Sequence, residues 1–144
     1  ARLWPADPHA RWLARSAACE MHGGFTGLRT DCGMGPDHTM VGPDRSPPPT
    51  GEAVSRDIRR IVSLWTEMRN RFGSGGPYLF GGGVTVADAM YAPVCARFHT
   101  YDVQLDAACT AYMERILALP QMVEWTAAAA SEPEEELQEL EVEF

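Results

Sequence analysis

Apolar residues recur at steps of three and four along most of this chain, the spacing that places them on one face of an α-helix. The first stripe starts after Asp7-Pro8, where the Asp side chain can accept from free backbone amides and Pro needs no N–H. It predicts a helix over about residues 8–31. Its apolar members are Ala14, Ala17, Met21, Phe25 and Leu28.

The same spacing predicts further helices over about residues 51–72, 85–99, 105–119 and 121–131. Residues 33–50, by contrast, hold five Pro and three Gly, which cannot sustain a helix or a central strand. We therefore expect a long flexible loop there. Because no segment alternates convincingly between apolar and polar residues, the pattern indicates an all-α fold, a helical bundle.

Length and composition fit one globular domain, since the chain has 144 residues and is 45% hydrophobic. We assign this domain to residues 1–131. Residues 132–144 carry seven Glu and no cation, and we expect a disordered acidic tail because like charges repel each other. The alternative is an acidic amphipathic helix on a neighbour, because Leu137, Leu140 and Phe144 recur at helical steps.

Most of the net charge of −8 comes from this tail, because the rest of the chain holds thirteen acidic residues and twelve Arg. A nearly neutral body lacks the basic footprint that nucleic-acid binding requires, so we expect no nucleic-acid partner. No apolar run reaches the roughly 18 residues of a membrane span, and the chain does not open like a signal peptide. We expect a soluble, cytoplasmic protein without a membrane partner.

The four Cys are scattered without a CxxC pair, which favours reduced thiols. Cys19, His22, Cys32 and His38 suggest a zinc site, because the first two share a helix face. Structural zinc sites, however, usually pair closely spaced Cys-Cys and His-His ligands. The order and the long gap here do not match that arrangement, so we predict no metal site.

In the segment GVTVADAM, residues 83–90, Asp88 is the one ionisable side chain in an apolar run. Thr85 followed three residues later by Asp88 fits a capping box, in which each side chain binds the other's backbone N–H. Val84 and Ala89 fit the accompanying hydrophobic staple. A general acid or base would need a partner and an open pocket. The sequence indicates neither, so we predict a structural role for Asp88 and no catalytic residue in this chain.

These residues resemble a known family. TVADA at residues 85–89, after Leu-Phe-Gly at 79–81, resembles the capping box that opens the sixth helix of glutathione S-transferases. Residues 117–120 (LALP) and 124–125 (EW) resemble the last turns of the same C-terminal helical domain. CEMHGGF, residues 19–25, resembles the fourth helix of the bacterial, beta-class enzymes. The resemblance implies the all-α bundle of that domain.

The resemblance, which extends over residues 1 to about 131, also implies a ligand pocket. In the family, the His at the position of His22 reaches the glutathione site, usually with a Lys after it, and Gly23 takes that place here. The other residues that it places at the glutathione and substrate pocket are Arg15, Cys19, Arg97, Phe98 and Tyr101. A solvated or paired Arg15, a core Cys19 and core aromatics are the structural alternatives. Pro93 bends the same helix and could shape the pocket.

The resemblance implies a parent enzyme of detoxification that joins glutathione, as co-substrate and without another cofactor, to small electrophiles. In that family a preceding thioredoxin-like domain holds glutathione and supplies the residue that activates its thiol. No segment here resembles that domain, so we expect a piece of a longer, homodimeric protein that is inactive alone. The alternative is a non-catalytic interaction domain, because helical domains of this type also serve as assembly modules in translation factors and synthetase complexes.

Overall fold

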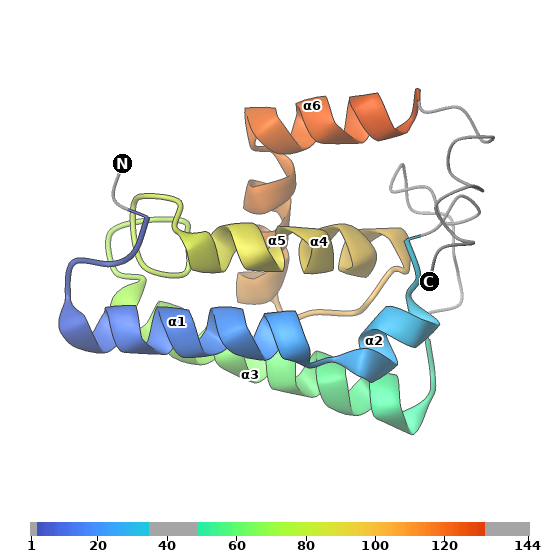
Figure 1. The fold of residues 1–144 in the computed structure, drawn as a ribbon, viewed down its shortest axis with the longest axis horizontal. Helices are drawn as coiled ribbons and strands as arrows, with labels where there is room; N and C mark the ends of the chain where they lie inside the picture. Colours follow the sequence, from blue (N-terminus) through green and yellow to red (C-terminus); the bar gives the residue numbers. More distant parts are fainter. Residues whose placement is uncertain (1–2, 35–48, 132–144) are drawn as a thin grey trace.

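The computed structural model of this chain describes residues 3–34 and 49–131. The helices in these ranges are α1 (Pro8–Gly23), α2 (Thr26–Asp31), α3 (Glu52–Phe72), α4 (Val86–Thr100), α5 (Ala107–Leu117) and α6 (Pro120–Ala129) (Figure 1). Beside them, the β-type pairing in the described part is one isolated bridge between Tyr78 and Gly81. The predicted all-α class is confirmed. None of the described helices is both long and apolar enough to span a bilayer.

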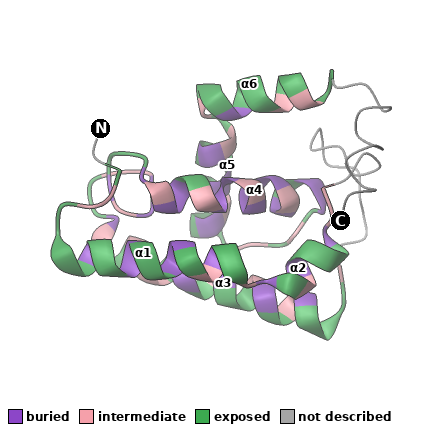
Figure 2. Ribbon diagram, in the orientation of Figure 1, coloured by how far each residue is buried: buried purple, intermediate pink, exposed green. Residues whose placement is uncertain are grey.

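Helix α4 forms the centre of the bundle, packed between α1 and α5 (Figure 1). Figure 2 shows that α4 is buried along most of its length, whereas the outer faces of α1 and α6 are exposed. A helix that carries apolar residues on every side is stable only inside a core. Helix α3 contacts α1, α2 and α5, and α6 packs on α5. The functional surfaces therefore have to lie along the edges of α4.

An aromatic cluster holds α3, α4 and α5 together. Trp65 of α3 lies with its ring centroid 6.0 Å from that of Tyr91, 5.5 Å from Phe98 and 4.8 Å from Tyr112. All four side chains are fully buried. Edge-to-face and tilted pairs at these distances add to the large area that each ring removes from water. This cluster fixes the position of α4, from which the site residues project.

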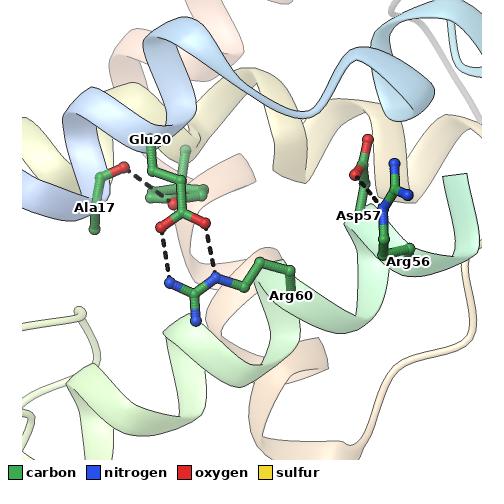
Figure 3. A network of polar contacts seen from close by, with 6 residues as sticks. Ala17, Glu20, Arg56, Asp57 and Arg60 are labelled. Atoms are coloured by element: carbon green, nitrogen blue, oxygen red, sulfur yellow. Dashed lines mark hydrogen bonds and ion pairs between the residues drawn. The ribbon is translucent and has the colours of Figure 1, made fainter. Parts of the chain in front are cut away.

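Polar contacts join α1 to α3 and α4. Arg60 of α3 donates to both carboxylate oxygens of Glu20 of α1, at 2.7 and 2.8 Å (Figure 3). The hydroxyl of Tyr91 donates to the carbonyl of Ala17, at 3.2 Å. The ion pair is partly exposed, so its contribution is modest, but its two parallel hydrogen bonds fix the register of α1 on α3.

The helix predicted over residues 8–31 is not continuous, and the prediction was wrong there. Helix α1 ends at Gly23, and Phe25 takes left-handed angles, φ 58° and ψ 43°, before α2 starts. Gly23 and Gly24 weaken the helix because glycine loses the most backbone freedom on folding. The apolar stripe concealed the break, since Phe25, the residue that caps α2, and Leu28 within α2 are both buried and continue the stripe of α1.

The guanidinium of Arg29 in α2 closes the C-terminal end of α1. It donates to the carbonyls of Met21 at 2.6 Å, His22 at 3.3 Å and Gly24 at 3.2 Å. The last carbonyls of a helix have no partner within it, and a cation there also opposes the negative end of the helix dipole. Arg29 is therefore held at the end of α1, close to His22.

Helix α2 lies against the start of α3. Asp57 of α3 accepts the backbone N–H of Leu28 at 3.1 Å, and Arg56 stands 3.9 Å from the same carboxylate (Figure 3). At Gly27, a Cβ would stand 2.7 Å from the backbone carbon of Ala53, so a larger residue does not fit. This close approach sets the direction in which α2 runs toward the end of α4.

The other helices begin and end within two residues of the predicted bounds 51–72, 85–99, 105–119 and 121–131. Helix α5 starts at its cap, Asp106, whose carboxylate accepts the N–H of Cys109 at 2.8 Å. Most of the loop predicted over 33–50 and the whole tail predicted over 132–144 lie outside the described residues. The division into domain and tail stays a prediction.

Candidate functional site

Asp88 is fully buried and its carboxylate accepts four hydrogen bonds. Oδ2 accepts from the backbone N–H and the hydroxyl of Thr85, both at 2.8 Å. Oδ1 accepts from the N–H of Leu79 at 3.0 Å and from the hydroxyl of Tyr112 at 3.3 Å. The predicted capping box of Thr85 and Asp88 is present at the start of α4. The carboxylate thus joins the loop before α4 to α5.

The phenol of Tyr112 is suited to donate to Asp88. Burial raises the pKa of Tyr112 well above its ordinary value, and the negative charges of Cys95 and Asp88 raise it further. A phenol with a raised pKa keeps its proton at neutral pH. The pair therefore acts as a buried hydrogen bond, without a proton acceptor open to a substrate.

A cavity of about 330 Å³ lies where α1, α2 and α4 meet, at the C-terminal end of α1. We call it the cationic cavity, and its lining residues are Met21, His22, Arg29, Ala89, Met90, Pro93 and Arg97. Figure 1 shows that α2 continues beyond α1 toward the C-terminal end of α4. Side chains of all three helices line the cavity. Its volume falls in the range of small-molecule sites.

Arg97 is anchored at the edge of this cavity. Its guanidinium donates to the carbonyl of Cys32, which follows α2. The pKa of Arg97 is lowered, first by burial and then by the positive charge of Arg29. An Arg keeps its charge at neutral pH even so. The cavity therefore brings two guanidinium groups close enough to repel each other.

Pro93 helps to open the cavity beside α4. It lies inside the helix, where its ring cannot donate to the carbonyl of Ala89. Both residues line the cationic cavity together with Met90. The wall that α4 contributes is therefore apolar at Ala89, Met90 and Pro93 and ends in the guanidinium of Arg97, while α1 and α2 contribute His22 and Arg29.

Of the residues predicted at the pocket, His22 and Arg97 come together in the cationic cavity. His22 is exposed near the end of α1. Cys19 is exposed on the preceding turn and Arg15 stacks on Trp4, 5.7 Å from its ring centroid, and neither of them lines this cavity. Both stand on the same helix as His22, but they do not share its cavity.

Phe98 and Tyr101 are placed differently. Phe98 is 1% exposed and packs on Trp65 in the aromatic cluster. Tyr101 is buried, and its hydroxyl donates to the carbonyl of Gly33 at 3.1 Å. Neither ring lines the cationic cavity, in accord with the core alternative for aromatic residues at the end of α4.

Arg29, Met21 and Met90 line the cavity but were not among the predicted pocket residues. In a continuous helix over 8–31, Arg29 would stand on a solvent face. The glycine pair before Phe25 was the feature that could have placed it, because a break turns Arg29 back toward α1. The two Met belong to apolar stripes, which predict a core and do not distinguish the lining of a cavity from it.

A second cavity, of about 380 Å³, lies between α4 and the corner that joins α5 to α6. We call it the apolar cavity, and its lining residues are Val84, Asp88, Ala89, Ala92, Leu119, Gln121 and Met122. Val84, predicted as half of a staple, is 44% exposed at its edge. Asp88 borders this space, but its oxygens are taken by the four donors described above, so no acid or base is available here.

The thiols of the described residues are not arranged for catalysis or metal binding. Burial raises the pKa of Cys32 to about 11, although the charge of Arg97 opposes the shift. Within residues 3–34 and 49–131, no three His, Cys, Asp or Glu side chains gather as metal ligands do. His38, the last member of the zinc set that was considered, lies outside the described residues.

Comparison with known proteins gives one informative match. The family model described as glutathione S-transferase, C-terminal domain, matches residues 51–128, which is more than half of the chain. A search of curated proteins gives no match. The matched range contains α3, α4, α5 and all but the last residue of α6, including Arg97 and the capping box, whereas α1 and α2 precede it.

Proposed function

The chain belongs to the glutathione S-transferase C-terminal domain family, and on that premise we propose that it forms the electrophile-pocket wall of a bacterial, cytoplasmic glutathione transferase. The parent protein joins glutathione to small electrophiles. The observation that carries this proposal is the cationic cavity, in which His22 and Arg97 lie beside an apolar wall of α4.

The described residues supply binding groups and no thiol-activating group. The cavity offers an imidazole that can contact glutathione, and two guanidinium groups beside apolar surface that can hold the electrophile. A thioredoxin-like domain, typical of the family, then supplies the donor that stabilises the thiolate. The thiol releases its proton to water and its sulfur bonds to the electrophilic carbon. An aryl halide then loses halide with the bonding electrons, whereas an enone takes up a proton at its α-carbon and loses no group.

Conjugation assays test this proposal. The full-length protein should join glutathione to 1-chloro-2,4-dinitrobenzene, with release of chloride, and the reaction should be visible by absorbance. The 144-residue chain alone should show no rate above the uncatalysed reaction. A full-length protein that binds glutathione but conjugates none of a panel of aryl halides and enones would contradict the proposal. So would ordinary transferase activity of the isolated chain.

The second candidate, a non-catalytic interaction domain, is favoured by exposed apolar side chains. Trp12 is 68% exposed on α1, and Val123 and Trp125 are 57% and 42% exposed on α6. The family also forms homodimers, and Trp12 gives α1 an apolar surface for such an interface. Sedimentation of the chain and of its Trp12→Ser variant tests this use. A wild-type monomer at every concentration would contradict dimerisation through α1.

A further inference from the structure

Among residues 3–34 and 49–131, no acidic side chain lines the cationic cavity. Arg29, Arg97 and His22 line it. The ion pairs of the described residues join other arginines to their carboxylates. Arg29 and Arg97 donate to backbone carbonyls instead. Two guanidinium charges and an imidazole thus line one cavity to which the described part of the chain brings no carboxylate.

The two arginines are not equivalent. Arg29 donates to three carbonyls at the end of α1. Its main contribution to the cavity is therefore positive charge, and fewer of its N–H groups are left to bind a ligand. Arg97 donates to the carbonyl of Cys32 alone among the described residues, and a guanidinium has five N–H donors. Arg97 is also only partly exposed, and it lines the cavity. A forked donor of this kind matches the two oxygens of a carboxylate.

The rest of the lining is apolar. Met21, Met90 and Pro93 line the same cavity, which has a volume of about 330 Å³. Thioether and ring surfaces accommodate flat apolar groups of various shapes. A ligand that contacts both the guanidinium groups and the apolar part of the lining therefore carries one anionic group on a small apolar body.

We propose that the cationic cavity binds small carboxylates with an apolar body, the carboxylate against Arg97 and the body against Met90 and Pro93. The inference rests on the proposed function in one respect: in a transferase, this ligand is the electrophile, so the parent prefers electrophiles that carry a carboxylate. Arg97 is then the residue that determines specificity, and Arg29 raises the positive potential around it.

A binding experiment on the 144-residue chain tests the site itself. Isotope-labelled protein is titrated with benzoate and, separately, with benzamide, which has the same shape and no charge, while amide resonances are followed by NMR. Benzoate should shift the resonances of Met90 and Arg97 and bind at least about tenfold more tightly than benzamide. Equal affinities of the two compounds in the unmodified chain would overturn the proposal without the need for any variant.

Variants locate the carboxylate. Arg97→Gln should weaken benzoate binding about tenfold and leave benzamide binding unchanged. Arg56→Gln, which removes an exposed arginine of α3 outside the cavity, is the matched control and should leave both unchanged. Thermal unfolding of each variant establishes that the fold is retained. If folded Arg97→Gln binds benzoate as the unmodified chain does, the assignment of Arg97 is wrong.

The full-length protein separates this inference from the proposed function. With 4-chloro-3-nitrobenzoate and its amide as paired electrophiles, Arg97→Gln should lower kcat/KM about tenfold for the benzoate and little for the amide, with the KM of glutathione unchanged. A rise in the KM of glutathione with both compounds would assign Arg97 to glutathione and overturn the inference. A lack of turnover of either compound would contradict the proposed function, and the benzoate titration would still decide the site.

Discussion

At the scale of single residues, Asp88 and Arg97 differ in how many hydrogen-bond partners their charged groups have within the fold. Asp88 is fully buried with four donors on its oxygens, so its charge is used within the fold. Arg97 borders a cavity and has one backbone acceptor among the described residues. A charge that is fully paired stabilises the fold, whereas a charge that is not paired by an acid is available to a ligand.

Substitution of Asp88 by Ala should therefore damage folding before function. The change leaves the buried N–H groups of Leu79 and Thr85 without an acceptor, so the free energy of unfolding should fall by at least about 2 kcal/mol. Urea unfolding of the chain measures this loss. Glu124→Ala, an exposed carboxylate of α6, is the control and should change stability little. A fully stable Asp88→Ala chain would contradict the capping role.

At the scale of elements, the break between α1 and α2 matters most for the cavity. A continuous helix over 8–31 would carry Arg29 away from α4. The left-handed Phe25 instead turns α2 so that Arg29 reaches the carbonyls at the end of α1, including that of His22. The cationic cavity therefore depends on the backbone conformation of Gly23, Gly24 and Phe25 as much as on the side chains that line it.

The two glycines of this break should respond differently to substitution. A Cβ at Gly24 would stand 2.7 Å from the carbonyl oxygen of Glu20, whereas a Cβ at Gly23 meets nothing within 4 Å. Gly24→Ala should lower the free energy of unfolding by about 1 kcal/mol or more, because a backbone atom must shift. Gly23→Ala should raise it by about 0.5 kcal/mol, since Ala favours the helix. Equal effects of the two changes on urea unfolding would show that the break is not held at Gly24.

Helix positions and the capping box could be predicted from sequence because they depend on neighbours along the chain. The spacing of Thr85 and Asp88 is local, and the structure confirms it. The break at Phe25 could not be derived from apolar spacing, which records burial and not backbone angles. The cavity could not be predicted from the sequence either, because its lining residues come from three helices. Arg29 and Arg97 line the same cavity only because α2 turns after Phe25. The spacing of apolar residues does not specify that turn.

At the scale of the whole molecule, the core is rich in thiol and phenol groups that resist ionisation. Burial raises the pKa of Cys32 to about 11, and it also raises the pKa values of Tyr91, Cys95, Cys109 and Tyr112. In the unfolded chain, thiols and phenols titrate near their ordinary values. At alkaline pH, the folded chain therefore keeps protons on these thiols and phenols that the unfolded chain releases.

This difference predicts alkaline instability. A thiol ionises near pH 9.0 when unfolded, but Cys32 ionises near pH 11 when folded. The stabilisation is complete below pH 9, and it is lost as the pH rises toward 11 because the unfolded state then binds fewer protons. Urea midpoints under reducing conditions should be highest at pH 7.5, lower at pH 9.5 and lowest at pH 10.5. Cys32→Ala should flatten part of this slope, and a midpoint that stays constant or rises with pH would contradict it.

We propose that α1 brings His22 to the glutathione site of a transferase, and one kinetic measurement tests this proposal most directly. In the full-length protein, His22→Ala should raise the KM of glutathione about fivefold, the effect of one lost hydrogen bond, with little change in kcat. His9→Ala, an exposed histidine on the same helix, is the matched control and should leave both constants unchanged. If His22→Ala leaves the KM of glutathione as it is in the unmodified enzyme, His22 does not belong to the site.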